Sequence, residues 1–136
     1  MAWLAPTLYY VVAVGALGIT GKLALRTLVW QDLVLWTGLG YILVAGFLLL
    51  SGQTELKFTA GSGWALASAG IAISSLIALY LALTVGKAST VVPITAAYPA
   101  VTLLLAAAVL SEQLTLVRVA GVLLVIAGVV ILTASG

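Results

Sequence analysis

The sequence of 136 residues contains no cysteine and no histidine, and each absence excludes a class of chemistry. Without cysteine there is no disulfide framework, no thiolate nucleophile and no cysteine-ligated metal. Without histidine, the commonest general base and the commonest metal ligand are missing. The only carboxylates are Asp32, Glu55 and Glu112. We therefore expect no catalytic residue, no metal and no cofactor, and we do not expect an enzyme.

Charge is almost as scarce. Charged residues make up 6% of the sequence, against roughly 25% in soluble domains, and hydrophobic residues make up 65%, against roughly 45–50%. A chain with so little polar surface cannot cover a soluble fold, so the composition predicts an integral membrane protein whose surroundings are the lipid bilayer. The formal net charge of +2 comes from scattered residues, without the basic cluster of a nucleic-acid-binding protein.

Five uncharged stretches each approach the roughly 20 apolar residues that cross the hydrocarbon core as a helix. All charged side chains lie between these stretches or at their edges, because charge is costly at the bilayer centre. The stretches are too long for the strands of a membrane barrel. The sequence predicts an all-α, multi-pass membrane protein with a single domain over residues 1–136. The expected transmembrane helices are at about 3–21, 33–50, 63–85, 90–110 and 116–134.

The basic residues say little about orientation. An odd number of helices places the two termini on opposite sides of the membrane. Lys22, Arg26 and Lys87 then share a side with the C-terminus, while Lys57 and Arg118 share the other side. The positive-inside rule acts on this difference, which is only one residue. Two interpretations stay open: a weakly biased protein with its N-terminus outside, or a dual-topology protein whose copies insert both ways and form an antiparallel ten-helix dimer.

A series of short motifs occupies the C-terminal half. They are ALTVGKAS at 82–89, VP at 92–93, YP at 98–99, SEQLT at 111–115, and a last helix with Gly121 and Gly128. Together they resemble the EamA-type domain of the drug/metabolite transporter superfamily, and the resemblance extends over essentially the whole chain. The chain departs from the family pattern at Ser111, where glycine is frequent, and at Gln113, where arginine is frequent.

The resemblance implies a transporter. Larger family members carry two five-helix units in opposite orientations, so a single unit implies half of a ten-helix inverted-repeat transporter that works as a homodimer, expected to be antiparallel. The implied activity is transport of small organic metabolites across the cell (inner) membrane. Two alternatives stay open: a flippase of lipid-linked sugars, and a non-transporting subunit of a larger membrane complex. No carboxylate lies in the middle of an expected helix, which argues against proton antiport through such a residue.

A polar stripe in the fourth expected helix is the clearest candidate for a substrate path. Thr95, Tyr98 and Thr102 are spaced i, i+3 and i+7, so they lie on one helix face. Pro99 frees the carbonyl of residue 95 and kinks the helix, which a membrane tolerates only inside protein or beside a water-filled cavity. In the alternative interpretation, the threonine hydroxyls bond their own backbone and Tyr98 bonds a neighbouring helix.

Three further residues are candidates for the same path. Lys22 lies about one turn inside the membrane if the first helix continues past it, where it either attracts anions or snorkels to the headgroups. Ser75 lies in a helix crowded with small residues, a composition that favours close packing over a substrate contact. Tyr80 shares a helix face with Lys87, seven residues further along.

Glycines in the first and last helices predict close helix packing, either within the chain or at a dimer interface. The candidates are Gly15, Gly18, Gly121 and Gly128. Glu112 lies in the turn before the last helix, where we expect a structural role. It would either pair with Arg118 or accept hydrogen bonds from backbone N–H groups of that helix.

Overall fold

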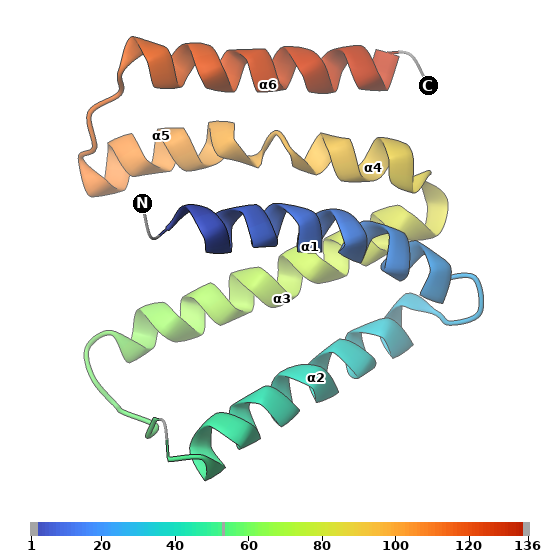
Figure 1. Cartoon of the computed structure of the whole chain (residues 1–136), viewed down its shortest axis with the longest axis vertical. Helices are drawn as coiled ribbons and strands as arrows, with labels where there is room; N and C mark the ends of the chain where they lie inside the picture. The colour runs from blue at the N-terminus through green and yellow to red at the C-terminus, as the bar shows by residue number, and fades with distance from the viewer. Residues whose placement is uncertain (1–2, 53, 135–136) are drawn as a thin grey trace. The chain divides into compact units, whose positions relative to one another are not determined.

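A computed structural model describes residues 3–52 and 54–134, and within these ranges all regular structure is helical. The helices fall into two compact units, which we call the N-terminal unit (α1–α3) and the C-terminal unit (α4–α6). Five segments are long and apolar enough to cross a membrane when α4 and α5 are taken as one span. The predicted all-α membrane fold is confirmed. The helices are α1 (Leu4–Ala24), α2 (Trp30–Leu50), α3 (Ser62–Val85), α4 (Ala88–Thr95), α5 (Tyr98–Leu110) and α6 (Leu116–Ala134) (Figure 1).

Two helices are longer than the sequence predicted, because each extends into a segment that was expected to be a connection. α1 continues past its expected end at Gly21, so Lys22 belongs to its last turn. α2 begins at Trp30, before the expected residue 33. The reason is local, since the Asp32 carboxylate accepts a hydrogen bond from the Val29 N–H at 3.4 Å and so supports the first turn.

The span expected over residues 90–110 is confirmed as Ala88–Leu110. Within it, the structure has two helices, α4 and α5, separated by Ala96 and Ala97. Pro99 is the second residue of α5 and has no N–H to donate to the Thr95 carbonyl. The N–H groups of Ala96 and Ala97 bond carbonyls three residues back, at 3.0 and 3.1 Å, which tightens the chain between the helices. At the position of the expected proline kink, the span therefore has a two-residue turn between two helices.

α3 is the central helix of the N-terminal unit and packs against both α1 and α2 (Figure 1). Its contact with α1 is close because Gly21 has no side chain. A Cβ atom at Gly21 would lie 3.6 Å from both Leu83 Cδ1 and Tyr80 Cε1. Tyr80 and Leu83 are the buried hydrophobic side chains of the described chain, at 1% and 0% exposure.

In the C-terminal unit, α6 packs along both parts of the interrupted helix (Figure 1). The turn before α6 is built by three residues. Ser111 ends α5 in the left-handed conformation (φ 54°), and the Glu112 N–H donates to the Ala106 carbonyl at 3.2 Å. Thr115 Oγ1 then accepts the Arg118 N–H at 3.3 Å and caps α6. The left-handed backbone explains why glycine is frequent at position 111 in the family pattern.

Candidate functional site

Hydrogen bonds between helices meet near one end of the N-terminal unit, in a cluster that we call the polar junction. It consists of Lys22, Thr37, Tyr80 and the Leu83 carbonyl. Lys22 Nζ donates to the Leu83 carbonyl at 2.6 Å and so joins α1 to α3. This carbonyl is one of the last four of α3, which have no partner within their own helix. A cation is therefore well placed at this helix end.

The second link of the polar junction joins α2 to α3. Tyr80 Oη and Thr37 Oγ1 are 3.0 Å apart. The Thr37 hydroxyl donates to the Leu33 carbonyl at 2.8 Å, so the Tyr80 hydroxyl is the donor to Thr37. Within the described chain, no buried side-chain nitrogen or oxygen lacks a hydrogen-bond partner. The hydrogen bonds of the polar junction thus join the three helices of the N-terminal unit. The junction includes Lys22 and Tyr80, two of the residues expected on a substrate path.

A shallow groove of about 490 Å³ lies between α5 and α6 in the C-terminal unit. Its volume falls within the roughly 300–1,000 Å³ range of small-molecule sites. The lining is mostly apolar, and it includes Pro99, Gly121 and Val125. The polar side chains in the lining are Tyr98, Thr102, Glu112 and Arg118.

The groove gathers only part of the predicted polar stripe. Tyr98 and Thr102 line it, whereas Thr95 does not. Thr102 Oγ1 donates to the Tyr98 carbonyl at 3.2 Å, and Thr95 Oγ1 donates to the Val92 carbonyl at 2.6 Å. The threonines therefore bond their own backbone, as the alternative interpretation expected, while Tyr98 is 56% exposed.

Ser75 lies outside both clusters. It is exposed on α3, and its hydroxyl donates to the Ala72 carbonyl at 2.9 Å. This backbone bond is how a serine is satisfied in an apolar helix without a partner on another helix. Thr37 of the polar junction was not among the predicted site residues. Its spacing from Asp32 and Trp36 within α2 gives no signal that it contacts a tyrosine on α3.

The four candidate packing glycines divide into two kinds. Gly18 is buried in the N-terminal unit, so it serves packing within the chain. A Cβ atom at Gly15, Gly121 or Gly128 would meet no atom within 4 Å other than those of its chain neighbours and its own helix backbone. Within its own unit, each of these three glycines therefore has space for a side chain.

Glu112 pairs with Arg118, which is one of the two structural roles that the sequence suggested for Glu112. Arg118 Nη1 lies 3.9 Å from Glu112 Oε2, and the two side chains are 53% and 59% exposed for the glutamate and the arginine. An exposed pair at this separation adds little stability. Its position is more informative, because it places both signs of charge at one end of the α5–α6 groove.

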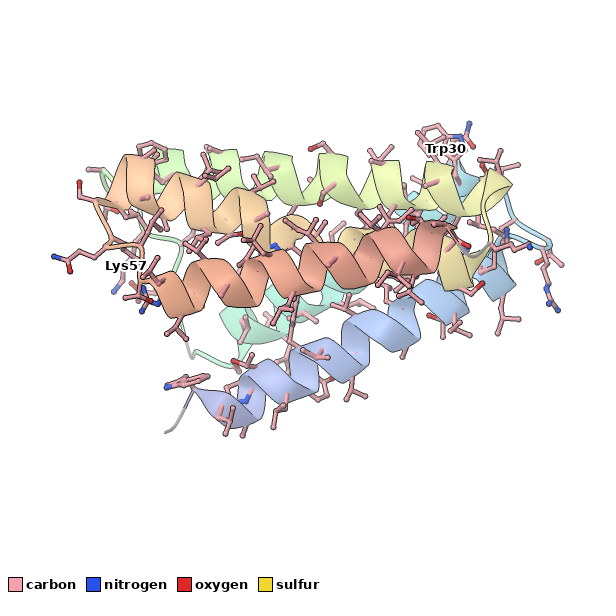
Figure 2. The ribbon with its side chains drawn as sticks, turned by 90° about the horizontal axis from the view of Figure 1, so that it is seen from above. Trp30 and Lys57 are labelled. Carbon is pink, nitrogen blue, oxygen red and sulfur yellow. The ribbon has the colours of Figure 1, made fainter. Side chains whose placement is uncertain are left out.

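Figure 2 shows Trp30 and Lys57 at opposite ends of the N-terminal unit. Trp30 opens α2, and Lys57 lies in the connection between α2 and α3. An amphipathic aromatic residue and a lysine at the two ends of apolar helices are typical of the two membrane interfaces. The spans, their ends and their charges thus define a multi-pass integral membrane protein.

The chain belongs to the EamA-like transporter family, whose family model matches residues 1–134. The family consists of multi-pass membrane transporters of small molecules rather than enzymes, and the inner membrane is their typical location. Over 72 residues, the chain is 40% identical to Uncharacterized protein MJ1333.1 from Methanocaldococcus jannaschii. The aligned stretch covers 53% of each protein, so the match spans about half the length of this relative. No solved structure matches the chain.

Proposed function

We propose that the protein transports small organic metabolites as a homodimer whose two copies insert in opposite orientations. The observation that carries this proposal is the weak charge bias of a single five-span unit, with three basic residues on one side and two on the other. A bias of one residue allows both insertions. The family builds larger transporters from two such units in opposite orientations, which is the arrangement that an antiparallel dimer would reproduce.

The C-terminal unit supplies the substrate contacts in this proposal. The turn at Ala96 and Ala97 interrupts the regular helix, and irregular backbone in a membrane is tolerated beside a cavity. Tyr98 offers an exposed hydroxyl next to this interruption. The N-terminal unit holds its helices together through the polar junction, so we assign it the role of a frame. In this proposal, Lys22 and Tyr80 affect transport by holding this frame together and not by contacting the substrate.

A complementation experiment tests the antiparallel dimer. Thr27→Lys raises the basic count on the first side to four against two. A second variant, Arg26→Gln with Thr54→Lys and Gln113→Lys, reverses the count to two against four. Each variant should insert in a single orientation. In vesicles made from cells that express one variant, we expect no exchange of a radiolabelled metabolite panel, whereas co-expression should restore the wild-type rate.

Full activity of either variant alone would contradict the antiparallel dimer. If the wild-type protein drives no exchange across amino acids, sugars, nucleosides and small amines, the assignment to metabolites is wrong. These two failures differ, because the first concerns assembly and the second concerns the cargo.

A flippase of lipid-linked sugars is the second candidate, and the open α5–α6 groove favours it. A groove that is open along its side can admit a lipid chain while the polar part crosses elsewhere. In the same vesicles, a fluorescent polyprenyl-phosphate sugar should then become accessible to an impermeant quencher faster than in protein-free vesicles. Equal rates with and without protein would remove this candidate.

A further inference from the structure

The α5–α6 groove changes in character along its length. At the turn between the two helices it carries the Glu112–Arg118 pair, and both side chains are more than half exposed. Further along the groove, away from this pair, the lining is apolar, and it includes Leu103, Ala106 and Val122. Gly121 adds a gap in the α6 wall, because, apart from its chain neighbours and its own helix backbone, no atom lies within 4 Å of its Cβ position. The groove therefore has a charged end and an apolar body.

The length of the groove matches one leaflet of a bilayer. The 13 residues of α5 rise about 20 Å, from Tyr98 beside the helix interruption to the turn that holds Glu112. Half of a bilayer is about 15 Å of hydrocarbon, or about 21 Å with its headgroup region. The charged pair thus lies at headgroup depth and Tyr98 lies near the midplane. A molecule that filled the groove would have the dimensions of a lipid tail beneath its headgroup.

The charges specify which headgroup fits. A guanidinium suits a phosphate, to which it can donate two hydrogen bonds, and a carboxylate accepts hydrogen bonds from a primary ammonium. At 3.9 Å the pair is too loose for a strong direct bond, so a headgroup can insert without breaking one. We propose that the α5–α6 groove binds one phospholipid with a phosphate and a primary ammonium, with Arg118 on the phosphate, Glu112 on the ammonium and an acyl chain along the apolar body.

Lipid binding in this groove is tested independently of transport, although Tyr98 belongs to both proposals. A lipid held in the groove is compatible with a metabolite transporter and with a flippase, so failure of the transport experiments leaves the lipid site untouched. The converse also holds, because lipid retention is measured on the purified protein without any gradient.

Native mass spectrometry of the full-length protein in detergent tests the proposal. The protein is titrated with dioleoyl phospholipids whose headgroups are ethanolamine, choline or glycerol. We expect the ethanolamine lipid to be retained about tenfold more tightly, because choline has no N–H to donate and glycerol brings no cation for Glu112. Soluble glycerophosphoethanolamine should not compete at the same concentration, because the acyl chain supplies much of the affinity.

Four variants separate the contributions of headgroup and chain. Glu112→Gln should lower ethanolamine retention to the choline level, and Arg118→Gln should weaken all three lipids. Gly121→Leu fills the apolar body and should weaken all three lipids without changing their order. Gly128→Leu is the matched control, because it lies on the same helix with equally open space but outside the groove, and it should behave as the wild type. The two leucine variants raise helix propensity, so they keep the test valid if a charge variant fails to fold.

Three results would overturn the proposal. One is equal retention of the three headgroups by the wild type. Another is equal loss of lipid in Gly121→Leu and Gly128→Leu. A third is full competition by soluble glycerophosphoethanolamine, which would make the groove a site for a small polar phosphoamine rather than for a lipid.

Discussion

In the N-terminal unit, Lys22 and Tyr80 bond groups on another helix, whereas in the C-terminal unit Thr95 and Thr102 bond the backbone of their own helix. The first unit buries Tyr80 and Leu83, while none of the described residues in α4, α5 or α6 is buried. Interhelical hydrogen bonds and close glycine contacts are what hold helices together in lipid. The N-terminal unit is thus held together by contacts between its own helices, whereas the helices of the C-terminal unit bury none of their described residues.

The largest expected effect comes from the same substitution made in both units. Tyr80→Ala removes a buried ring and its hydrogen bond to Thr37, and we expect a loss of about 3 kcal/mol in the free energy of unfolding. Tyr98→Ala removes an exposed ring, and the change should stay below about 1 kcal/mol. Unfolding in mixed micelles, followed by circular dichroism, measures both. Equal losses would erase the contrast between the units.

Lys22→Gln tests the other link of the polar junction. The charged hydrogen bond to the Leu83 carbonyl is short and half-buried, so its removal should cost about 1.5–2 kcal/mol of unfolding free energy. Lys57→Gln is the control, because Lys57 is exposed in a connection and should change stability by less than about 0.5 kcal/mol. If Lys22→Gln were as stable as its control while anion transport fell, Lys22 would belong to the substrate path rather than to the frame.

Pro99→Ala closes the interruption in the C-terminal unit. The restored N–H can bond the Thr95 carbonyl, so α4 and α5 should merge and the exchange rate should fall about tenfold, or about 1.4 kcal/mol in barrier. Pro93→Ala changes a proline inside α4 and leaves Pro99 in place, so it should keep the wild-type rate. A wild-type rate in Pro99→Ala would show that the interruption is not needed for transport.

Ser111→Gly should stabilise the C-terminal unit by about 1 kcal/mol, because Ser111 holds a left-handed conformation that glycine adopts without steric cost. Ser51→Gly is the matched control in the N-terminal unit. Ser51 ends α2 with an ordinary φ of −74°, so glycine there should not stabilise. Thermal unfolding of the two variants side by side separates a backbone effect from a general effect of glycine. A gain of the same size in both variants would contradict this explanation.

Glu112→Gln should give the smallest stability change, within about 0.5 kcal/mol, because the pair with Arg118 is long and exposed. Its effect on lipid retention should be much larger. Glu55→Gln, in the exposed connection of the N-terminal unit, should change neither quantity. A loss above 2 kcal/mol in Glu112→Gln would instead assign the glutamate a role in folding.

The sequence predicted the spans well because lipid imposes a simple rule of length and charge on every helix. It placed Thr95, Tyr98 and Thr102 on one face, and Tyr98 and Thr102 line one groove whereas Thr95 does not. It could not predict the polar junction, because Lys22, Thr37 and Tyr80 meet only through the packing of three helices. It also expected a kink where Pro99 interrupts the helix, since local pattern does not fix how far a freed backbone unwinds.

The most direct test of the antiparallel dimer is the orientation of the wild-type charge pattern. A single cysteine in place of Thr27 or of Gln113 lies in connections on opposite sides of the membrane, and the chain has no other cysteine. An impermeant thiol reagent is applied to intact cells and again after permeabilisation. If copies insert in both orientations, about half of them should label from outside at both positions. Complete labelling at one position and none at the other would show a single fixed orientation and contradict the antiparallel dimer.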